Sequence, residues 1–230
     1  MGGYLARPDI EGAKPGVLVG MELYGVTAHV RDVCDNLARL GYVALAPDLY
    51  HRSVAGVELP ADEAGRNAGF GFLHQLTREQ VLADLTVAYD ALEQRSSRIA
   101  GMVGLSVGGH LAYLAATQLP LKATVVVYGG WIPTTDLPLG QPDPTITLTG
   151  GIRGKVLFLV GDDDPLVPTE QRDTLTAAMT TAGVDHEFVV YPNVGHGFLC
   201  DRRPSYDRHA ATDAWVHIAD TLRLAGGDET

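Results

Sequence analysis

The stretch that decides the fold of this chain reads Ile99-Ala100-Gly101-Met102-Val103-Gly104-Leu105-Ser106-Val107-Gly108. It begins as a continuous apolar run, which is typical of a strand buried on both faces of a sheet. It ends in a Gly-x-Ser-x-Gly turn, and a helical pattern follows from His110 to Leu119. Strand, sharp turn and helix is the context in which a serine projects from a sheet edge as a nucleophile. Ser106 is therefore the candidate nucleophile.

Composition and charge exclude several classes of partner. The chain has 230 residues, of which 46% are hydrophobic and 20% charged, so we expect one globular domain over residues 1–230. Its net charge of −11 argues against nucleic acid and against anionic membrane surfaces, because both need a basic face. No apolar run is as long as a membrane span, and the N-terminus does not read as a signal peptide, so we expect a cytoplasmic protein. Cys34 and Cys200 are too few for a disulfide framework.

Short apolar runs alternate with helical patterns along the chain. This alternation predicts an open, doubly wound α/β fold with a mostly parallel sheet and helices on both faces. The expected strands are Val17–Met21, Tyr42–Ala46, Ile99–Leu105, Ala123–Tyr128, Val156–Val160 and Glu187–Tyr191. The expected helices lie around 30–40, 75–92, 110–119, 169–182 and 206–224.

Two segments interrupt this rhythm, His51–Gly71 and Gly129–Gly154. Both follow strands and lack clear periodicity, so we interpret them as loops. Ligands of open parallel sheets bind beyond the carboxyl ends of strands, which makes these loops the expected walls of a site. The alternative is that they are plain surface connections.

A serine needs a base, and the base needs an orienting acid. Asp162-Asp163-Asp164 follows the strand Val156–Val160, and His196 follows the strand Glu187–Tyr191 in a glycine-flanked loop. We favour Asp164 as the acid because prolines stiffen its loop, with Asp162 as the alternative. His196 is the expected base, although a lone histidine is more often structural. The order Ser, Asp, His matches one known arrangement of such triads.

The same chemistry needs backbone donors for an oxyanion. We expect one from Val107, directly after the serine, and one from Leu23, in the loop after the first strand. Side chains beyond strand ends are candidates for the walls of a substrate pocket, although each could equally serve packing. These are Tyr24, His51, Trp131 and Phe198.

Several segments together resemble the dienelactone hydrolase family, a branch of the α/β-hydrolases. They span nearly the whole chain and are Val17–Arg52 with its core Gly41–Tyr50, Gly104–Gly109, Gly161–Pro168 and Tyr191–Phe198. The resemblance implies an α/β-hydrolase fold and supports Asp164 as triad acid, His196 as base and Leu23 as oxyanion donor. It also implies that Glu22 contacts the nucleophile. The opening residues Tyr4–Pro8 resemble the second strand of a hairpin that begins many members.

The chain departs from that family at two functional positions. The best-known members use cysteine as nucleophile, whereas Ser106 stands here, so Glu22 is left to orient the hydroxyl or to shape the pocket. Cys200 stands where members that process dienelactones place a carboxylate-binding arginine. Arg202 and Arg203 are near but shifted, and Arg66 is a candidate for a second charge.

We therefore expect a serine hydrolase that cleaves a small ester or lactone through an acyl-enzyme, without cofactor or metal, as a monomer or homodimer. A second hypothesis places thioester hydrolysis, C–C bond cleavage or a lactonising step of a biosynthetic pathway on the same triad, because one fold hosts many chemistries. A third is a non-catalytic binding protein that has kept the fold.

Overall fold

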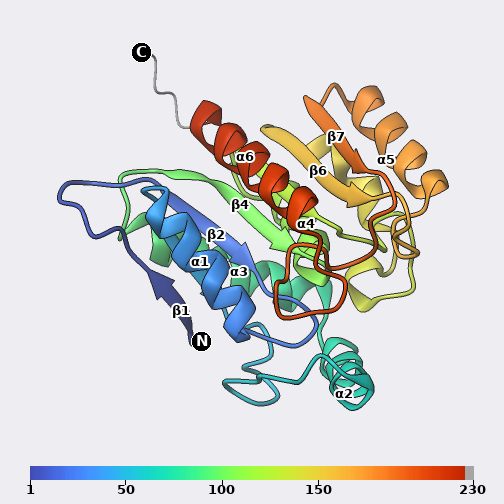
Figure 1. The fold of residues 1–230 in the computed structure, drawn as a ribbon, viewed down its shortest axis with the longest axis horizontal. Helices are drawn as coiled ribbons and strands as arrows, with labels where there is room; N and C mark the ends of the chain where they lie inside the picture. The colour runs from blue at the N-terminus through green and yellow to red at the C-terminus, as the bar shows by residue number, and fades with distance from the viewer. Residues whose placement is uncertain (226–230) are drawn as a thin grey trace.

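A computed structural model describes residues 1–225, so residues 226–230 of the expected domain lie outside the described part. The described chain forms a seven-stranded sheet of order β1-β3-β2-β4-β5-β6-β7 (Figure 1). All neighbouring strands are parallel except β1, which pairs antiparallel to β3 at the sheet edge. The strands are β1 Gly3–Ala6, β2 Gly16–Gly20, β3 Val43–Pro47, β4 Ile99–Leu105, β5 Ala123–Val127, β6 Lys155–Gly161 and β7 His186–Tyr191.

Helices cover both faces of this sheet. The apolar sides of α1 and α6 pack on one face, and those of α3, α4 and α5 pack on the other. This arrangement confirms the predicted α/β-hydrolase fold. The sheet is doubly wound because β3 lies on one side of β2, whereas β4 to β7 follow in order on the other side. The long helices are α1 Ala28–Arg39, α3 Arg78–Glu93, α4 Val107–Ala116, α5 Thr169–Ala182 and α6 Arg208–Ala225.

Local sequence explains where these helices begin and which side they bury. Thr77 and Gln80 form a capping box at the start of α3, because each side chain bonds to the other's backbone N–H. In α1, Val30, Val33 and Leu37 recur at helical spacing and are all buried. Helix α4 is apolar all round and lies wholly in the core, as a helix behind a central strand must.

The segment 51–71 is not a plain loop, which corrects the sequence interpretation. Its second half forms most of helix α2, Glu63–Leu73, which runs two residues past the segment. Asp62 caps the first turn of this helix by accepting a 2.8 Å bond from the N–H of Gly65. Two glycines let this helix approach backbone closely: a Cβ on Gly65 would lie 1.9 Å from the Pro60 carbonyl oxygen, and one on Gly69 would lie 2.7 Å from that of Leu23. Because α2 packs through glycines, its sequence lacks the apolar periodicity by which helices were predicted, and the helix was missed. The segment 129–154 also contains two short 3-10 helices, η1 Pro138–Gly140 and η2 Thr145–Gly151.

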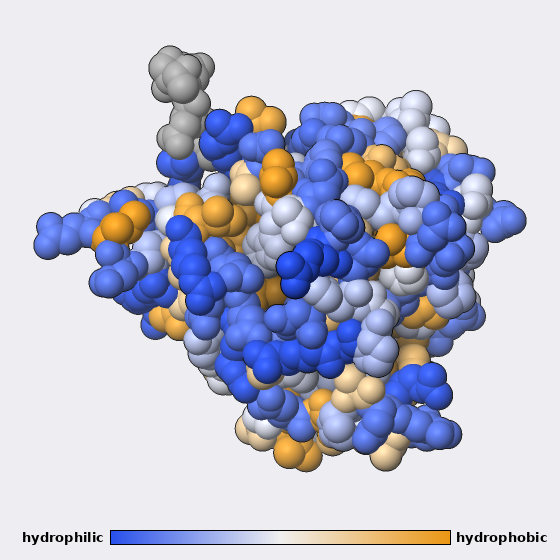
Figure 2. Space-filling view, in the orientation of Figure 1, coloured by the Kyte–Doolittle hydropathy of each residue, from blue (hydrophilic) through white to orange (hydrophobic). Residues whose placement is uncertain are grey.

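The surface seen in Figure 2 is mostly hydrophilic, with apolar side chains scattered over it. Within residues 1–225, no helix is both long and apolar enough to cross a membrane.

Candidate active site

Ser106 lies on a strained turn between β4 and α4. Its backbone has φ 55° and ψ −119°, a conformation that non-glycine residues rarely adopt. The turn is held against its neighbours by glycine contacts: a Cβ on Gly104 would lie 1.8 Å from the Gly108 carbonyl oxygen, and one on Gly108 would lie 2.2 Å from that of Gly20. Glycines at these two positions are therefore a steric requirement of the turn, which carries Ser106 above the sheet edge.

A continuous chain of hydrogen bonds links Ser106 to His196 and Asp164. The Oγ of Ser106 lies 3.0 Å from Nε2 of His196, and Nδ1 of His196 lies 2.8 Å from Oδ2 of Asp164. The Asp164 side chain is fully buried, and its Oδ1 accepts a 2.9 Å bond from the N–H of Leu166. Both carboxylate oxygens are thus held, which fixes the imidazole through Nδ1 and directs Nε2 at the serine.

The two aspartates that precede Asp164 in the chain are exposed and do not bond to His196. Asp162 is exposed, and its Oδ1 accepts a bond of 2.5 Å from the N–H of Asn193, three residues before His196. Asp163 is also exposed. Of the two candidates that the sequence left open, only Asp164 reaches the imidazole, while Asp162 braces the loop that carries it.

The expected oxyanion donors lie on two adjoining segments. Val107 is the first residue of α4, and Leu23 follows β2, whose end lies against the start of α4 at Gly20 and Gly108. The carbonyl of Leu23 accepts a 3.0 Å bond from the hydroxyl of the buried Tyr50, which fixes this peptide. Among the hydrogen bonds within the described residues, the N–H groups of Val107 and Leu23 donate to no protein acceptor.

Glu22 is buried, 1% exposed, and forms an ion pair with Arg203 through a 2.5 Å contact between Oε2 and Nη2. The guanidinium of Arg203 also lies over the ring of Tyr24, 5.0 Å from its centroid. The structure thus brings together Glu22, Tyr24 and Arg203. Arg66 is an exposed residue of helix α2, and Cys200 is buried.

Tyr128, which sequence reasoning did not single out, packs directly against His196. The two rings meet edge-on, with centroids 5.0 Å apart, and Tyr128 has φ 42° just beyond β5. Its hydroxyl is buried and finds no hydrogen-bond partner among residues 1–225, and burial raises the pKa of this phenol well above its usual value. The sequence signal that could have identified Tyr128 is its position at the end of a strand, which it shares with Asp164 and His196.

The other three side chains predicted to line a substrate pocket, His51, Trp131 and Phe198, each contact a different part of the molecule. His51 bonds through Nε2 to Asp84 of α3, at 3.1 Å. Trp131 is half-buried and packs edge-on against Phe70 of α2, which joins the segment 129–154 to that helix. Phe198 is completely buried between Tyr128 and Tyr191, so it supports the ring behind His196 and cannot line a pocket. The wall prediction is wrong for Phe198, because its ring turns inward and packs against the rings of Tyr128 and Tyr191.

Within residues 1–225, no group of three or more His, Cys, Asp and Glu side chains is arranged to hold a metal ion. The site brings together a serine hydroxyl, an imidazole and a buried carboxylate from three strand ends, with the backbone N–H groups of Val107 and Leu23 on adjoining segments.

Comparisons with known proteins agree on one family. The family model for the dienelactone hydrolases matches residues 1–225. A candidate carboxymethylenebutenolidase of Synechocystis sp. is 37% identical over 219 residues, covering 94% of this chain and 88% of that protein. A protein of the same description from Escherichia coli is 35% identical and covers 100% of this chain and 84% of its own length.

Solved structures show the same relationship. The crystal structure of a candidate dienelactone hydrolase from Klebsiella pneumoniae superposes with a TM-score of 0.85 at 31% identity, covering 96% of this chain and 92% of that one. A dienelactone hydrolase-like promiscuous phosphotriesterase from metagenomic libraries gives a TM-score of 0.78 at 25% identity, with 97% and 92% covered. This chain therefore belongs to the dienelactone hydrolase family and is a hydrolase of the ester and lactone type.

Proposed function

We propose that Ser106, His196 and Asp164 act as a catalytic triad that hydrolyses a small ester or lactone through an acyl-enzyme. The observation that carries this proposal is the unbroken hydrogen-bond chain from Oγ of Ser106 to the buried carboxylate of Asp164. Each of the three groups has the partner that its role requires.

The steps follow from this geometry. Oγ of Ser106 attacks the ester carbonyl carbon while Nε2 of His196 takes its proton, and the N–H groups of Val107 and Leu23 bind the oxyanion. The protonated imidazole then gives its proton to the leaving alkoxide, and Asp164 stabilises the imidazolium meanwhile. Water, deprotonated by His196, attacks the acyl-enzyme and returns the serine hydroxyl.

Covalent labelling tests the nucleophile. A fluorophosphonate probe should modify Ser106 in the wild type, located by mass spectrometry, and should not modify the chain when Ser106→Ala is introduced. Ser205 is exposed, and Ser205→Ala is a matched control that should keep the label. Labelling elsewhere, or none at Ser106 in folded protein, would contradict the proposal.

The reaction type is tested by a substrate panel. Short p-nitrophenyl esters, simple lactones and acyl thioesters are compared at equal concentration, with Ser106→Ala as the background. Ester and lactone turnover that depends on Ser106 supports the proposal, whereas a preference for thioesters favours the second hypothesis. Covalent labelling without turnover of any of them would favour a reaction outside hydrolysis.

A further inference from the structure

The turn Glu22–Gly25 follows β2 and carries the N–H of Leu23, the expected oxyanion donor. The N–H of Gly25 donates a 3.0 Å hydrogen bond to the carbonyl of Glu22, which closes the turn over four residues. This carbonyl and the Leu23 N–H belong to one trans peptide, so they point in opposite directions. The bond from Gly25 therefore sets the direction of the Leu23 N–H.

The next two carbonyls of the turn are also held by hydrogen-bond donors. The carbonyl of Leu23 accepts a 3.0 Å bond from the hydroxyl of Tyr50, and that of Tyr24 accepts a 3.0 Å bond from the N–H of Leu59. Three consecutive carbonyls, from Glu22 to Tyr24, thus each have a donor. Of these three donors, Tyr50 is the one side chain, so a substitution can remove its bond and leave the backbone bonds in place.

Close backbone contacts leave this turn little room to move. Gly25 has φ 87°, and a Cβ there would lie 2.1 Å from the carbonyl oxygen of Val57. A Cβ on Gly69 of α2 would lie 2.7 Å from the carbonyl oxygen of Leu23, the same atom that the Tyr50 hydroxyl bonds. The Leu23 carbonyl thus meets both a side-chain donor and the backbone of α2, and a shift of either would move the Leu23 peptide.

Tyr50 is itself held firmly. It is 1% exposed, and its ring centroid lies 5.4 Å from that of Phe72 of α2. Its backbone N–H donates a 3.1 Å bond to Oδ1 of Asp48, whose other oxygen accepts a 2.7 Å bond from the N–H of Gly56. Burial raises the pKa of the Tyr50 phenol, so the hydroxyl stays protonated and remains a donor at neutral pH and above.

We propose that Tyr50 is a positioning residue for catalysis: its hydroxyl holds the Leu23 carbonyl and thereby keeps the Leu23 N–H aimed at the oxyanion of the transition state. The inference rests on the proposed function, because it takes Leu23 as an oxyanion donor to an ester attacked by Ser106. A preformed donor stabilises the transition state more than the ground state. Tyr50 should therefore affect catalysis more than substrate binding.

Tyr50→Phe tests this role, because it removes the hydroxyl and keeps the ring that packs on Phe72. Without its donor the buried Leu23 carbonyl is no longer satisfied, and the turn gains freedom to rotate. We expect kcat/KM for a p-nitrophenyl ester to fall roughly 10-fold, which is less than the loss of about 10²- to 10³-fold on removal of an oxyanion donor outright.

A pair of inhibitors separates transition-state from ground-state effects. In an alkyl trifluoromethyl ketone the carbonyl carbon bonds to Oγ of Ser106, the serine proton passes to His196, and the carbonyl oxygen becomes the oxyanion. Its inhibition constant should rise in Tyr50→Phe by the same factor by which kcat/KM falls. The matching methyl ketone does not form a stable adduct, so its inhibition constant should stay the same.

Tyr113 provides a matched control for the loss of a buried tyrosine hydroxyl. It is fully buried in α4, and its hydroxyl lies 2.5 Å from Oγ1 of Thr149, away from the turn Glu22–Gly25. Tyr113→Phe removes a comparable bond from the core. It should lower the stability of the fold and keep the kcat/KM and both inhibition constants of the wild type.

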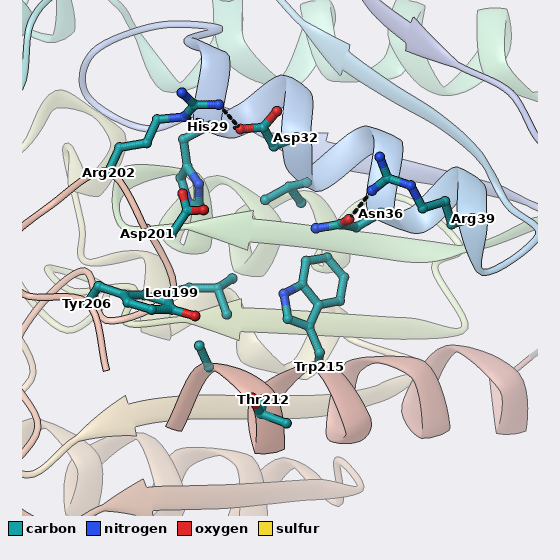
Figure 3. A pocket seen from close by; sticks show the side chains of 12 residues that line it. His29, Asp32, Asn36, Arg39, Leu199, Asp201, Arg202, Tyr206, Thr212 and Trp215 are labelled. Carbon is teal, nitrogen blue, oxygen red and sulfur yellow. Dashed lines mark hydrogen bonds and ion pairs between the residues drawn. The ribbon is translucent and has the colours of Figure 1, made fainter. Parts of the chain in front are cut away.

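Trp215 provides a control on the other face of the sheet. It lines a cavity of about 400 Å³, which Figure 3 shows between α1 and α6, with the ion pair of Arg202 and Asp32 at one end. The ring packs against the core beneath these two helices, whereas Tyr50 belongs to the core on the opposite face. Trp215→Leu should lower stability and leave the kinetics unchanged.

Gly69→Ala disturbs the same carbonyl from α2, and it serves as a second variant if circular dichroism shows that Tyr50→Phe does not fold. The new Cβ would lie 2.7 Å from the Leu23 carbonyl oxygen, so the Leu23 peptide or the helix must shift. The trifluoromethyl ketone should again lose more affinity than the methyl ketone. Gly71→Ala is the matched control on this helix, because nothing lies within 4 Å of its Cβ, and it should behave like the wild type.

Unchanged kcat/KM and trifluoromethyl ketone affinity in folded Tyr50→Phe would overturn the positioning role. An equal loss of affinity for both ketones, or an equal fall in kcat/KM in Tyr113→Phe, would also overturn it, because either would indicate general loosening of the fold. Absence of ester turnover that depends on Ser106 in the wild type would instead overturn the proposed function itself.

Discussion

The carboxylate of Glu22 accepts a hydrogen bond from the guanidinium of Arg203, a residue 181 positions further along the chain. Glu22 lies directly before the expected oxyanion donor Leu23, and Arg203 follows the loop that carries His196. The ion pair therefore ties the β2 side of the site to the β7 side. Since the Glu22 side chain is 1% exposed and that of Arg203 15%, the pair lies largely outside water.

Removal of one partner should leave a buried charge uncompensated. Arg203→Met keeps most of the side-chain volume but removes the cation, so we expect it to lower the free energy of unfolding by about 3–5 kcal/mol. Glu22→Gln together with Arg203→Met should cost less than the sum of the single changes, by about 1–3 kcal/mol. Urea unfolding of the four proteins measures this cycle, and additive losses would show that the pair does not stabilise the fold.

Asp164 should act through the orientation of His196. Asp164→Asn keeps the size of the side chain but removes the negative charge that selects the tautomer with hydrogen on Nδ1. We expect kcat to fall roughly 10³- to 10⁴-fold with little change in KM. Asp162→Asn is the matched control in the same loop, and it should retain most of the activity because, within residues 1–225, the Asp162 side chain bonds to the backbone of Asn193 and not to His196. Equal losses in the two variants would argue against Asp164 as the acid.

The turn that carries Ser106 should not tolerate a side chain at Gly104. In Gly104→Ala the new Cβ would meet the Gly108 carbonyl oxygen at 1.8 Å, so the turn or the adjoining strand must shift. We expect the free energy of unfolding to fall by about 1–3 kcal/mol and ester turnover to be lost. Thermal unfolding and ester turnover measure both. Gly195→Ala, beside His196 but with nothing within 4 Å of its Cβ, should unfold close to the wild type.

His110 should make stability depend on pH. Burial lowers the pKa of this histidine to about 3, and its Nε2 lies 2.7 Å from Oγ1 of Thr145. The unfolded chain takes up this proton near pH 6.5 but the folded chain only near pH 3, so its contribution is complete above about pH 6.5 and is lost as pH falls toward 3.

His110→Gln cannot take up a proton, and its amide can still bond to Thr145. Between pH 6.5 and 4 its stability should therefore decline less steeply than that of the wild type, by up to about 1.4 kcal/mol per pH unit. Urea unfolding at pH 7, 6, 5 and 4 measures both slopes. Parallel slopes would mean that His110 protonates equally easily in the folded and unfolded chains.

Much of the fold could be predicted from the sequence because its signals are local. Short apolar runs at Ile99–Leu105 and Val156–Val160, alternating with helical patterns, indicate buried parallel strands, and the structure has strands at both. Helix α2 escaped prediction because it packs through Gly65 and Gly69, and close backbone contact leaves no apolar pattern. Phe198 was misplaced for a related reason: its inward turn depends on Tyr128 and Tyr191, which are remote in the chain.

The sequence by itself determined the order of Ser106, Asp164 and His196 along the chain, each after a predicted strand, and the glycine-bounded turn at Ser106, because strand patterns and turns depend on residues close together in the chain. Only the tertiary structure decided which aspartate reaches His196, that Arg203 pairs with Glu22, and that the hydroxyl of Tyr50 bonds to the carbonyl of Leu23. These relationships join residues up to 181 positions apart. They arise only when neighbouring strands bring their carboxyl ends to one edge of the sheet, where distances of about an ångström decide which polar groups can bond.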